Sequence, residues 1–230
     1  MLTYLFFTGY FYGSYLGLEK YMPEYFPDSN GIVTRKYRIV NAVKSLALAG
    51  LCIPGSIFIY NLVYYPETVT FNDSNWIGAI YTATDASALL YNRNCHKSTL
   101  FHHIVVQLFY YYCYFMNFHM VNGLSRAIGL YCVYSSWAFL VNLRLSIRYL
   151  DYPKTEYYIN EVALYTYITS CTINWVTQLY LMIFVLNINY FINILYLLAL
   201  SMTIRDDLFL IRFLRKIDYN KKEDLKIKEN

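Results

Sequence analysis

Five ionisable residues lie within strongly apolar stretches of the sequence, and their types can carry acid–base chemistry. They are Lys44, Asp85, His102, His103 and Glu161. Ionisable groups inside a bilayer are energetically expensive, so each invites a functional hypothesis. A neutral imidazole can act as a general base or a nucleophile, and a carboxylate such as Asp85 could orient it and stabilise the imidazolium. His102, His103 and Asp85 are therefore candidate catalytic residues, on the condition that the protein is an enzyme.

The elements that must position these residues are predicted to be membrane-spanning helices. Hydrophobic residues make up 57% of the chain and charged residues 15%, whereas a soluble domain has about 25% charged residues. Five Cys without a CxxC pair exclude a disulfide scaffold, and the apolar content excludes disorder. A helix needs roughly 20 apolar residues to cross a bilayer. Seven stretches qualify or nearly do, which predicts an all-α polytopic transmembrane bundle: 2–18, 39–63, 75–91, 100–118, 124–143, 159–186 and 189–204.

Basic residues occur in alternate loops, which predicts the orientation in the membrane. Of the 19 Lys and Arg, four lie between the first two stretches, two in 92–99, three in 144–158 and eight after residue 204, whereas the other loops have none. The positive-inside rule then places the C-terminus in the cytosol and the N-terminus outside or in the lumen. If segment 2–18 does not cross, the N-terminus is cytosolic instead. The final residues KIKEN resemble a dilysine retrieval signal, which favours the endoplasmic reticulum.

The five ionisable residues are predicted to lie at similar depths, on the cytosolic side of the membrane. At a rise of about 1.5 Å per residue, Lys44 and Asp85 lie roughly 8–9 Å from the cytosolic ends of their helices. The His pair lies roughly 4–5 Å in, and Glu161 roughly 3 Å. One interpretation is a shared polar cavity that opens to the cytosol. In the alternatives, Lys44 snorkels to the surface or pairs with Asp85, the His pair contacts carbonyls and lipid headgroups, and Glu161 is a solvated helix start.

The spacing of the His pair limits what this site can be. Adjacent helical residues point about 100° apart, so His102 and His103 cannot both point equally into one cavity. We expect one of them to contact a neighbouring helix. The pair lacks the i, i+4 spacing that puts two ligands on one helix face, so no metal site is predicted. Nucleotide-binding motifs do not occur in the sequence, and neither a cofactor nor a nucleic-acid partner is predicted.

Four segments together resemble the TLC domain, named for translocating-chain-associated membrane proteins, ceramide synthases and the related Batten-disease membrane protein. They are 37–46 (YRIVNAVKSL), 81–90 (YTATDASALL) with Asp85, 99–107 (TLFHHIVVQ) with the His pair, and 134–144 (YSSWAFLVNLR) with Asn142 and Arg144. The resemblance covers about 38–215 and implies six TLC-type spans. Residues 1–37 then form an extra N-terminal span and a cytosolic polar loop, and residues 216–230 form a charged cytosolic tail.

The resemblance implies a multipass protein of the endoplasmic reticulum or a related membrane that acts on lipids or their distribution. In ceramide synthases the corresponding His pair is implicated in moving an acyl group from acyl-CoA to a sphingoid base. Here Val106 stands where those enzymes have Thr, Tyr134 stands where related proteins often carry an acid, and the downstream His-Asp motif is absent. The sequence is therefore more similar to the small TLC-domain-containing proteins than to the synthases.

Three functional hypotheses follow from the sequence. The first is lipid binding, sensing or membrane lipid homeostasis, with membrane lipids as partners and assembly into a homo-oligomer left open. The second is an acyl-CoA-dependent acyltransferase that uses the His pair, in which acyl-CoA is a substrate and not a cofactor. The third is a membrane transporter or scaffold. The candidate lipid-binding or ligand-binding residues are Lys44, Glu161, Asn142 and Arg144.

Overall fold

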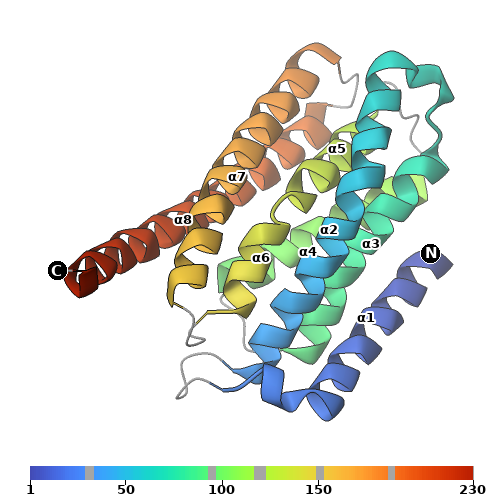
Figure 1. The fold of residues 1–230 in the computed structure, drawn as a ribbon. Helices are drawn as coiled ribbons and strands as arrows, with labels where there is room; N and C mark the ends of the chain where they lie inside the picture. Colours follow the sequence, from blue (N-terminus) through green and yellow to red (C-terminus); the bar gives the residue numbers. More distant parts are fainter. Residues whose placement is uncertain (29–33, 93–96, 117–122, 149–152, 186–189, 230) are drawn as a thin grey trace.

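The computed structural model of the protein describes residues 1–28, 34–92, 97–116, 123–148, 153–185 and 190–229. No strand occurs in these ranges, and the prediction of an all-α chain is confirmed. Each predicted span overlaps one helix, or in one case two (Figure 1). The helices are α1 (Leu2–Tyr21), α2 (Arg35–Tyr64), α3 (Phe71–Tyr91), α4 (Lys97–Met116), α5 (Leu124–Ser136), α6 (Phe139–Ser146), α7 (Pro153–Tyr180) and α8 (Tyr190–Glu229), with a π-helical turn at Leu181–Val185 and short 3₁₀ turns at Pro23–Tyr25 and Pro66–Thr68.

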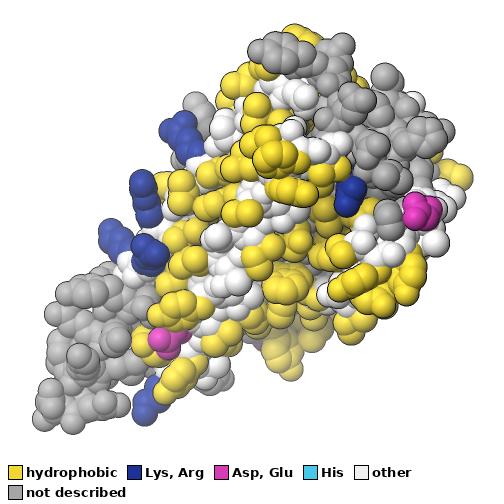
Figure 2. All heavy atoms as spheres, turned by 90° about the horizontal axis from the view of Figure 1, so that it is seen from above, with side chains coloured by type: hydrophobic (Ala, Val, Ile, Leu, Met, Phe, Trp, Pro, Cys, Tyr) yellow, Lys and Arg dark blue, Asp and Glu magenta, His cyan; other side chains and the backbone are white. Residues whose placement is uncertain are grey.

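Two helical segments are long and apolar enough to cross a membrane: helix α2, and Lys154–Val185, which comprises α7 and the π-helical turn. A third qualifies if α5 and α6, bent by 43° at their junction, form one span. By length and composition, two or three of the seven predicted spans therefore qualify among the described residues. Figure 2 shows hydrophobic side chains over much of the described part of the visible face, with most of the visible Lys and Arg side chains along one edge. An apolar outer surface of this extent indicates a membrane protein.

The N-terminal helix α1 is an integral part of the bundle and lies along α3 (Figure 1). Its buried face carries Tyr4, Phe11 and Tyr15. The Tyr4 hydroxyl donates to Gln107 Oε1 at 2.7 Å, which ties α1 to α4 as well. These contacts pack α1 together with the helices that follow it, although the sequence resemblance begins only at about residue 38.

The predicted span 124–143 is interrupted at the junction of α5 and α6. A break in a helix frees backbone carbonyls, which need other donors in an apolar environment. At the end of α5, the Tyr134 carbonyl accepts from Trp137 N at 3.2 Å and also from Ser170 Oγ of α7 at 2.6 Å. Ser45 Oγ of α2 donates to the carbonyl of Phe139, the first residue of α6, at 2.8 Å. Donors from two neighbouring helices therefore stabilise the break, which bends one wall of the cavity described below.

The last helix, α8, continues without interruption well past the point where the predicted span 189–204 ends. It runs obliquely beside the bundle and packs against α7 and α4 (Figure 1). Two adjacent carboxylates, Asp206 and Asp207, lie on the part of α8 that still contacts these helices. Helix α8 thereby adds acidic residues to the interior of the bundle.

Candidate functional site

A buried carboxylate connects three helices at the centre of the candidate site. Asp85 of α3 has no exposed surface. Its Oδ1 atom forms an ion pair with Lys44 Nζ of α2, and its Oδ2 atom lies 3.0 Å from His103 Nδ1 of α4. A charge in a dry interior requires partners that compensate it. Lys44 therefore pairs with Asp85 and does not extend alone toward the membrane surface.

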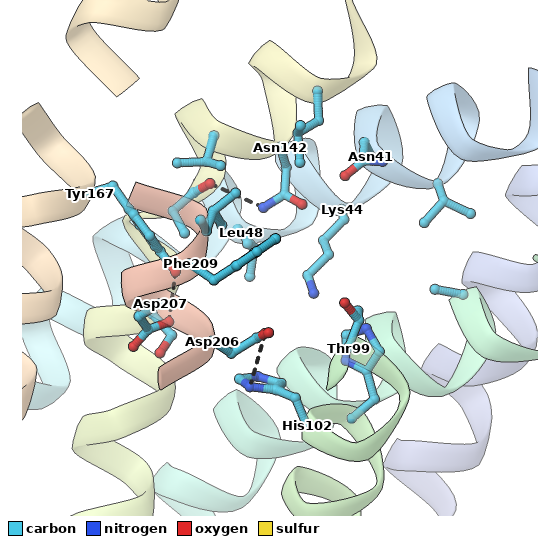
Figure 3. Close-up of a pocket in the computed structure, with 18 of the residues that line it drawn as sticks. Asn41, Lys44, Leu48, Thr99, His102, Asn142, Tyr167, Asp206, Asp207 and Phe209 are labelled. Carbon is cyan, nitrogen blue, oxygen red and sulfur yellow. Dashed lines mark hydrogen bonds and ion pairs between the residues drawn. The ribbon is translucent and has the colours of Figure 1, made fainter. Parts of the chain in front are cut away.

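His102 belongs to a second pair, on the side of the site that α8 provides. His102 Nδ1 lies 3.9 Å from Asp206 Oδ2 (Figure 3). The rings of His102 and His103 are nearly perpendicular, at 89°, with 5.7 Å between their centroids. The two side chains diverge, as helical geometry requires, yet both line one cavity. We expected one of them to contact a neighbouring helix; in the structure both do, His103 at Asp85 of α3 and His102 at Asp206 of α8.

These side chains surround a cavity of about 430 Å³, a volume within the range of about 300–1,000 Å³ that is typical of small-molecule sites. In Figure 3 the Lys44 side chain extends into the space between His102 and Asn142. The charged and polar lining includes Asn41, Lys44, Thr99, His102, His103, Asn142, Arg148, Asp206 and Asp207. The apolar and aromatic lining includes Val40, Leu48, Tyr81, Tyr131, Leu145, Leu210 and Phe213. The cavity is therefore amphipathic.

The lining changes in character along the axes of the helices. Tyr37 lies in the first turn of α2, and Lys44 lies about 10 Å further along the same helix at 1.5 Å per residue. Arg148 follows the end of α6 and also belongs to the end that is predicted to face the cytosol. Tyr131 of α5 lies at the opposite end of the cavity, where its ring packs edge-on against Tyr81 at 6.4 Å. The charged residues thus lie between the Arg148 end and an aromatic end at Tyr81 and Tyr131. Apolar and polar side chains occur at both ends: Leu145 and Phe213 lie near Arg148, and Ser135 and Asn174 lie near Tyr131.

Asp207 is held by neutral donors from α7. It accepts hydrogen bonds from the Tyr167 hydroxyl at 2.7 Å and from Trp175 Nε1 at 3.1 Å. Sequence reasoning missed both Asp206 and Asp207 because it ended the last span at residue 204. The signal was present in the sequence: the apolar pattern continues after the two carboxylates as LFLIRFL, which places them inside the helix and not after it.

Two of the four candidate lipid-binding residues line the cavity, namely Lys44 and Asn142. Asn142 Nδ2 donates to the Ala138 carbonyl of the preceding turn at 3.0 Å. The amide oxygen of Asn142 takes no part in this bond. Glu161 is half-buried and is not one of the residues that line the cavity. It lies on α7 next to Asn160, which belongs to a separate polar cluster.

That separate cluster contains the fourth candidate, Arg144. Its guanidinium is almost fully buried and forms an ion pair with Glu156 Oε1 at 2.7 Å. Arg144 Nε also donates to Asn160 Oδ1 at 3.1 Å, and Asn160 Nδ2 donates to the Leu214 carbonyl at 3.2 Å. These bonds fasten α6, α7 and α8 to one another. Arg144 therefore lies in a contact between helices, outside the cavity.

The imidazole of His103 lies against the Asp85 carboxylate, with Nδ1 and Oδ2 3.0 Å apart but without the geometry of a hydrogen bond. When Nδ1–H faces Asp85, the tautomer is fixed and Nε2 carries the lone pair that can accept a proton. A carboxylate behind an imidazole is the same arrangement that orients the base in many hydrolases and transferases. Across the described ranges, no group of three or more His, Cys, Asp or Glu side chains is placed to hold a metal ion.

Comparisons of the chain with family models, with curated proteins and with solved structures found no match. The resemblance to the TLC domain stays a prediction from the four sequence segments. What the site can do is therefore inferred from its own geometry. Its defining features are the Lys44–Asp85–His103 cluster, the His102–Asp206 pair and the amphipathic cavity that they line.

Proposed function

We propose that this protein is a multipass membrane protein of the TLC type that binds a membrane lipid in the cavity between α2, α4, α6 and α8. The observation that carries the proposal is the amphipathic lining of that cavity. A lipid has the same division, with a polar head joined to an apolar chain. Its head would contact Lys44, His102 and Asn142, and its chain would extend toward Tyr131. Such binding suits a role in lipid sensing or membrane lipid homeostasis.

The proposal includes seven crossings, a cytosolic C-terminus and residence in the endoplasmic reticulum. Support comes from the overlap of every predicted span with a helix and from the basic residues in alternate loops. In sealed microsomes we expect added protease to remove a C-terminal epitope without detergent. An epitope that becomes accessible only after detergent treatment would contradict the orientation, and separation from endoplasmic reticulum markers on a density gradient would contradict the location.

Lipid binding is tested by filling the cavity. Leu145 lines it, and Leu145→Trp places a larger side chain there. We expect the amount of lipid that co-purifies in mild detergent, measured by mass spectrometry, to fall about tenfold, which corresponds to a loss of about 1.4 kcal/mol of binding free energy. The matched control is Leu46→Trp, because Leu46 is exposed on the outer face of α2. Equal amounts of lipid in the two variants would refute binding in this cavity.

A specific contact favours acyl transfer as a second candidate function, namely the 3.0 Å approach of Asp85 Oδ2 to Nδ1 of His103, a residue that lines the cavity. In such a reaction the nitrogen or oxygen of an acceptor attacks the acyl carbon of acyl-CoA. His103 takes the proton from the acceptor and returns it to the sulfur of CoA when the carbon–sulfur bond breaks. His102, on the adjacent wall, would contact the carbonyl oxygen of the acyl group. Loss of turnover in a His103 variant that still binds lipid tests this function.

A further inference from the structure

A second, smaller cavity of about 40 Å³ lies next to the first one. It is formed by α3, α4, α5 and α8, which contribute Thr82, Val106 and Thr203 among others. Each of these three residues lies three positions from a charged or titratable residue of the main site: Thr82 from Asp85, Val106 from His103, and Thr203 from Asp206. Helix α4 runs opposite to α3 and α8. Thr82, Val106 and Thr203 therefore all lie on the same side of the charged residues, away from the end that is predicted to face the cytosol. The small cavity is therefore about one helical turn deeper, roughly 5 Å, than the ionisable residues.

The polar atoms around the small cavity already have partners. The hydroxyls of Thr82 and Thr203 donate to carbonyls of their own helices at 2.6 and 2.8 Å. The Tyr196 hydroxyl donates to Gln178 Oε1 at 2.6 Å. The other lining residues include Val105, Val106, Phe109, Ile128 and Leu200. A polar group that entered would lose hydrogen bonds to water and find no free partner, so the small cavity suits hydrocarbon.

One side chain, Tyr131, lines both cavities. Its ring packs edge-on against Tyr81, which lines the main cavity only. The aromatic end of the main cavity is thus also the partition in front of the small one. A molecule whose polar group contacts Lys44 and His103 and whose chain extends away from the Arg148 end meets Tyr131 next.

We infer that the small cavity receives the end of a fatty-acyl chain and that Tyr131 determines how long that chain can be. This inference rests on the proposed lipid-binding function and names the ligand as a molecule with an acyl chain, either acyl-CoA or a membrane lipid. The chain passes from the charged level to the Tyr131 ring, and the small cavity takes the carbons beyond it. Removal of the ring joins the two cavities and lengthens the chain that fits.

The test measures chain-length preference with two probe series that differ only in the number of carbons, saturated acyl-CoAs and lysophosphatidylcholines. Each series is offered as an equimolar mixture to purified protein, and the bound species are counted by native mass spectrometry. For Tyr131→Ala we expect a shift toward longer chains, with a gain of about fourfold in the long-to-short ratio for each additional methylene buried. The series that binds identifies the head of the ligand.

Two further variants extend the test beyond one substitution. Tyr131→Leu removes the ring and keeps an apolar side chain for packing, so it covers the case in which Tyr131→Ala does not fold. Ala199→Phe fills the small cavity from α8, and we expect it to shift the preference toward shorter chains. The matched control is Tyr165→Ala, because Tyr165 is exposed on the outside of α7.

The outcomes separate the inference from the function on which it rests. If wild-type protein binds neither series, the proposed lipid-binding function is wrong, and the inference is wrong with it. If wild-type protein binds lipid but the folded Tyr131 and Ala199 variants keep its chain-length profile, the inference alone is overturned. A shift toward longer chains in the Tyr131 variants and toward shorter chains in Ala199→Phe, with no shift in Tyr165→Ala, establishes the inference.

Discussion

Lys44→Met is expected to destabilise the protein by about 3–5 kcal/mol, the usual cost of removing one partner from a buried ion pair. Asp85 has no exposed surface, and without Lys44 its charge keeps only the contact with His103. The double variant Lys44→Met/Asp85→Leu should recover most of this loss, because replacing both partners by apolar residues is often neutral. The measurement is the melting temperature of each variant purified in the same detergent.

The control for this prediction is Lys20→Met, because Lys20 is exposed at the end of α1 and takes part in no ion pair that links the helices described in the site. If the Lys44→Met and Lys20→Met proteins have the same melting temperature, the Lys44–Asp85 pair has no stabilising role. A double variant less stable than Lys44→Met alone would show that Lys44 and Asp85 contribute separately. Recovery in the double variant would also supply a folded background that lacks the buried charges.

The helices could be predicted from the sequence because a run of roughly 20 apolar residues has few other stable structures in a membrane. The break between α5 and α6 could not. The hydroxyls that contact the backbone on its two sides belong to Ser45 and Ser170, which are distant in the sequence and reach it only after α2 and α7 have packed. The local sequence around residues 134–139 is apolar enough to continue as a single span, so only tertiary contacts reveal the bend.

The candidate site, like the fold, could be predicted only in part from the sequence. The cost of an ionisable group in an apolar stretch singled out Lys44, Asp85, Glu161 and the two His residues. All but Glu161 meet in the structure. Which partners they would choose depends on helix rotation, which sequence spacing does not fix. Arg144 was a candidate ligand-binding residue because of the resemblance of segment 134–144 to the TLC domain, yet its partner Glu156 lies only twelve residues away on α7 and closes a contact between helices.

If the protein is an acyltransferase, His103→Ala is expected to lower the rate of acyl transfer by about 10²–10⁴-fold, the contribution typical of a general acid–base group. His102→Ala should lower it less, because Asp206 lies 3.9 Å from His102 whereas Asp85 lies 3.0 Å from His103. The assay follows labelled acyl-CoA in membranes that express the chain, with sphingoid bases and other amine or hydroxyl acceptors. Ile104→Ala, a change on the exposed face of the same helix, is the matched control.

The decisive comparison for His103 is between turnover and binding in one preparation. Loss of His103 also removes one of the two partners of the buried Asp85, so some loss of stability is expected in either case. If His103 acts as a base, the product formed per folded, lipid-bound molecule falls, and added imidazole restores part of the rate by supplying the missing proton acceptor. If His103 only packs against Asp85, lipid, stability and product fall together and imidazole restores nothing. Wild-type membranes that form no more product than His103→Ala membranes contradict catalysis, and the His103–Asp85 contact is then part of a lipid-binding site alone.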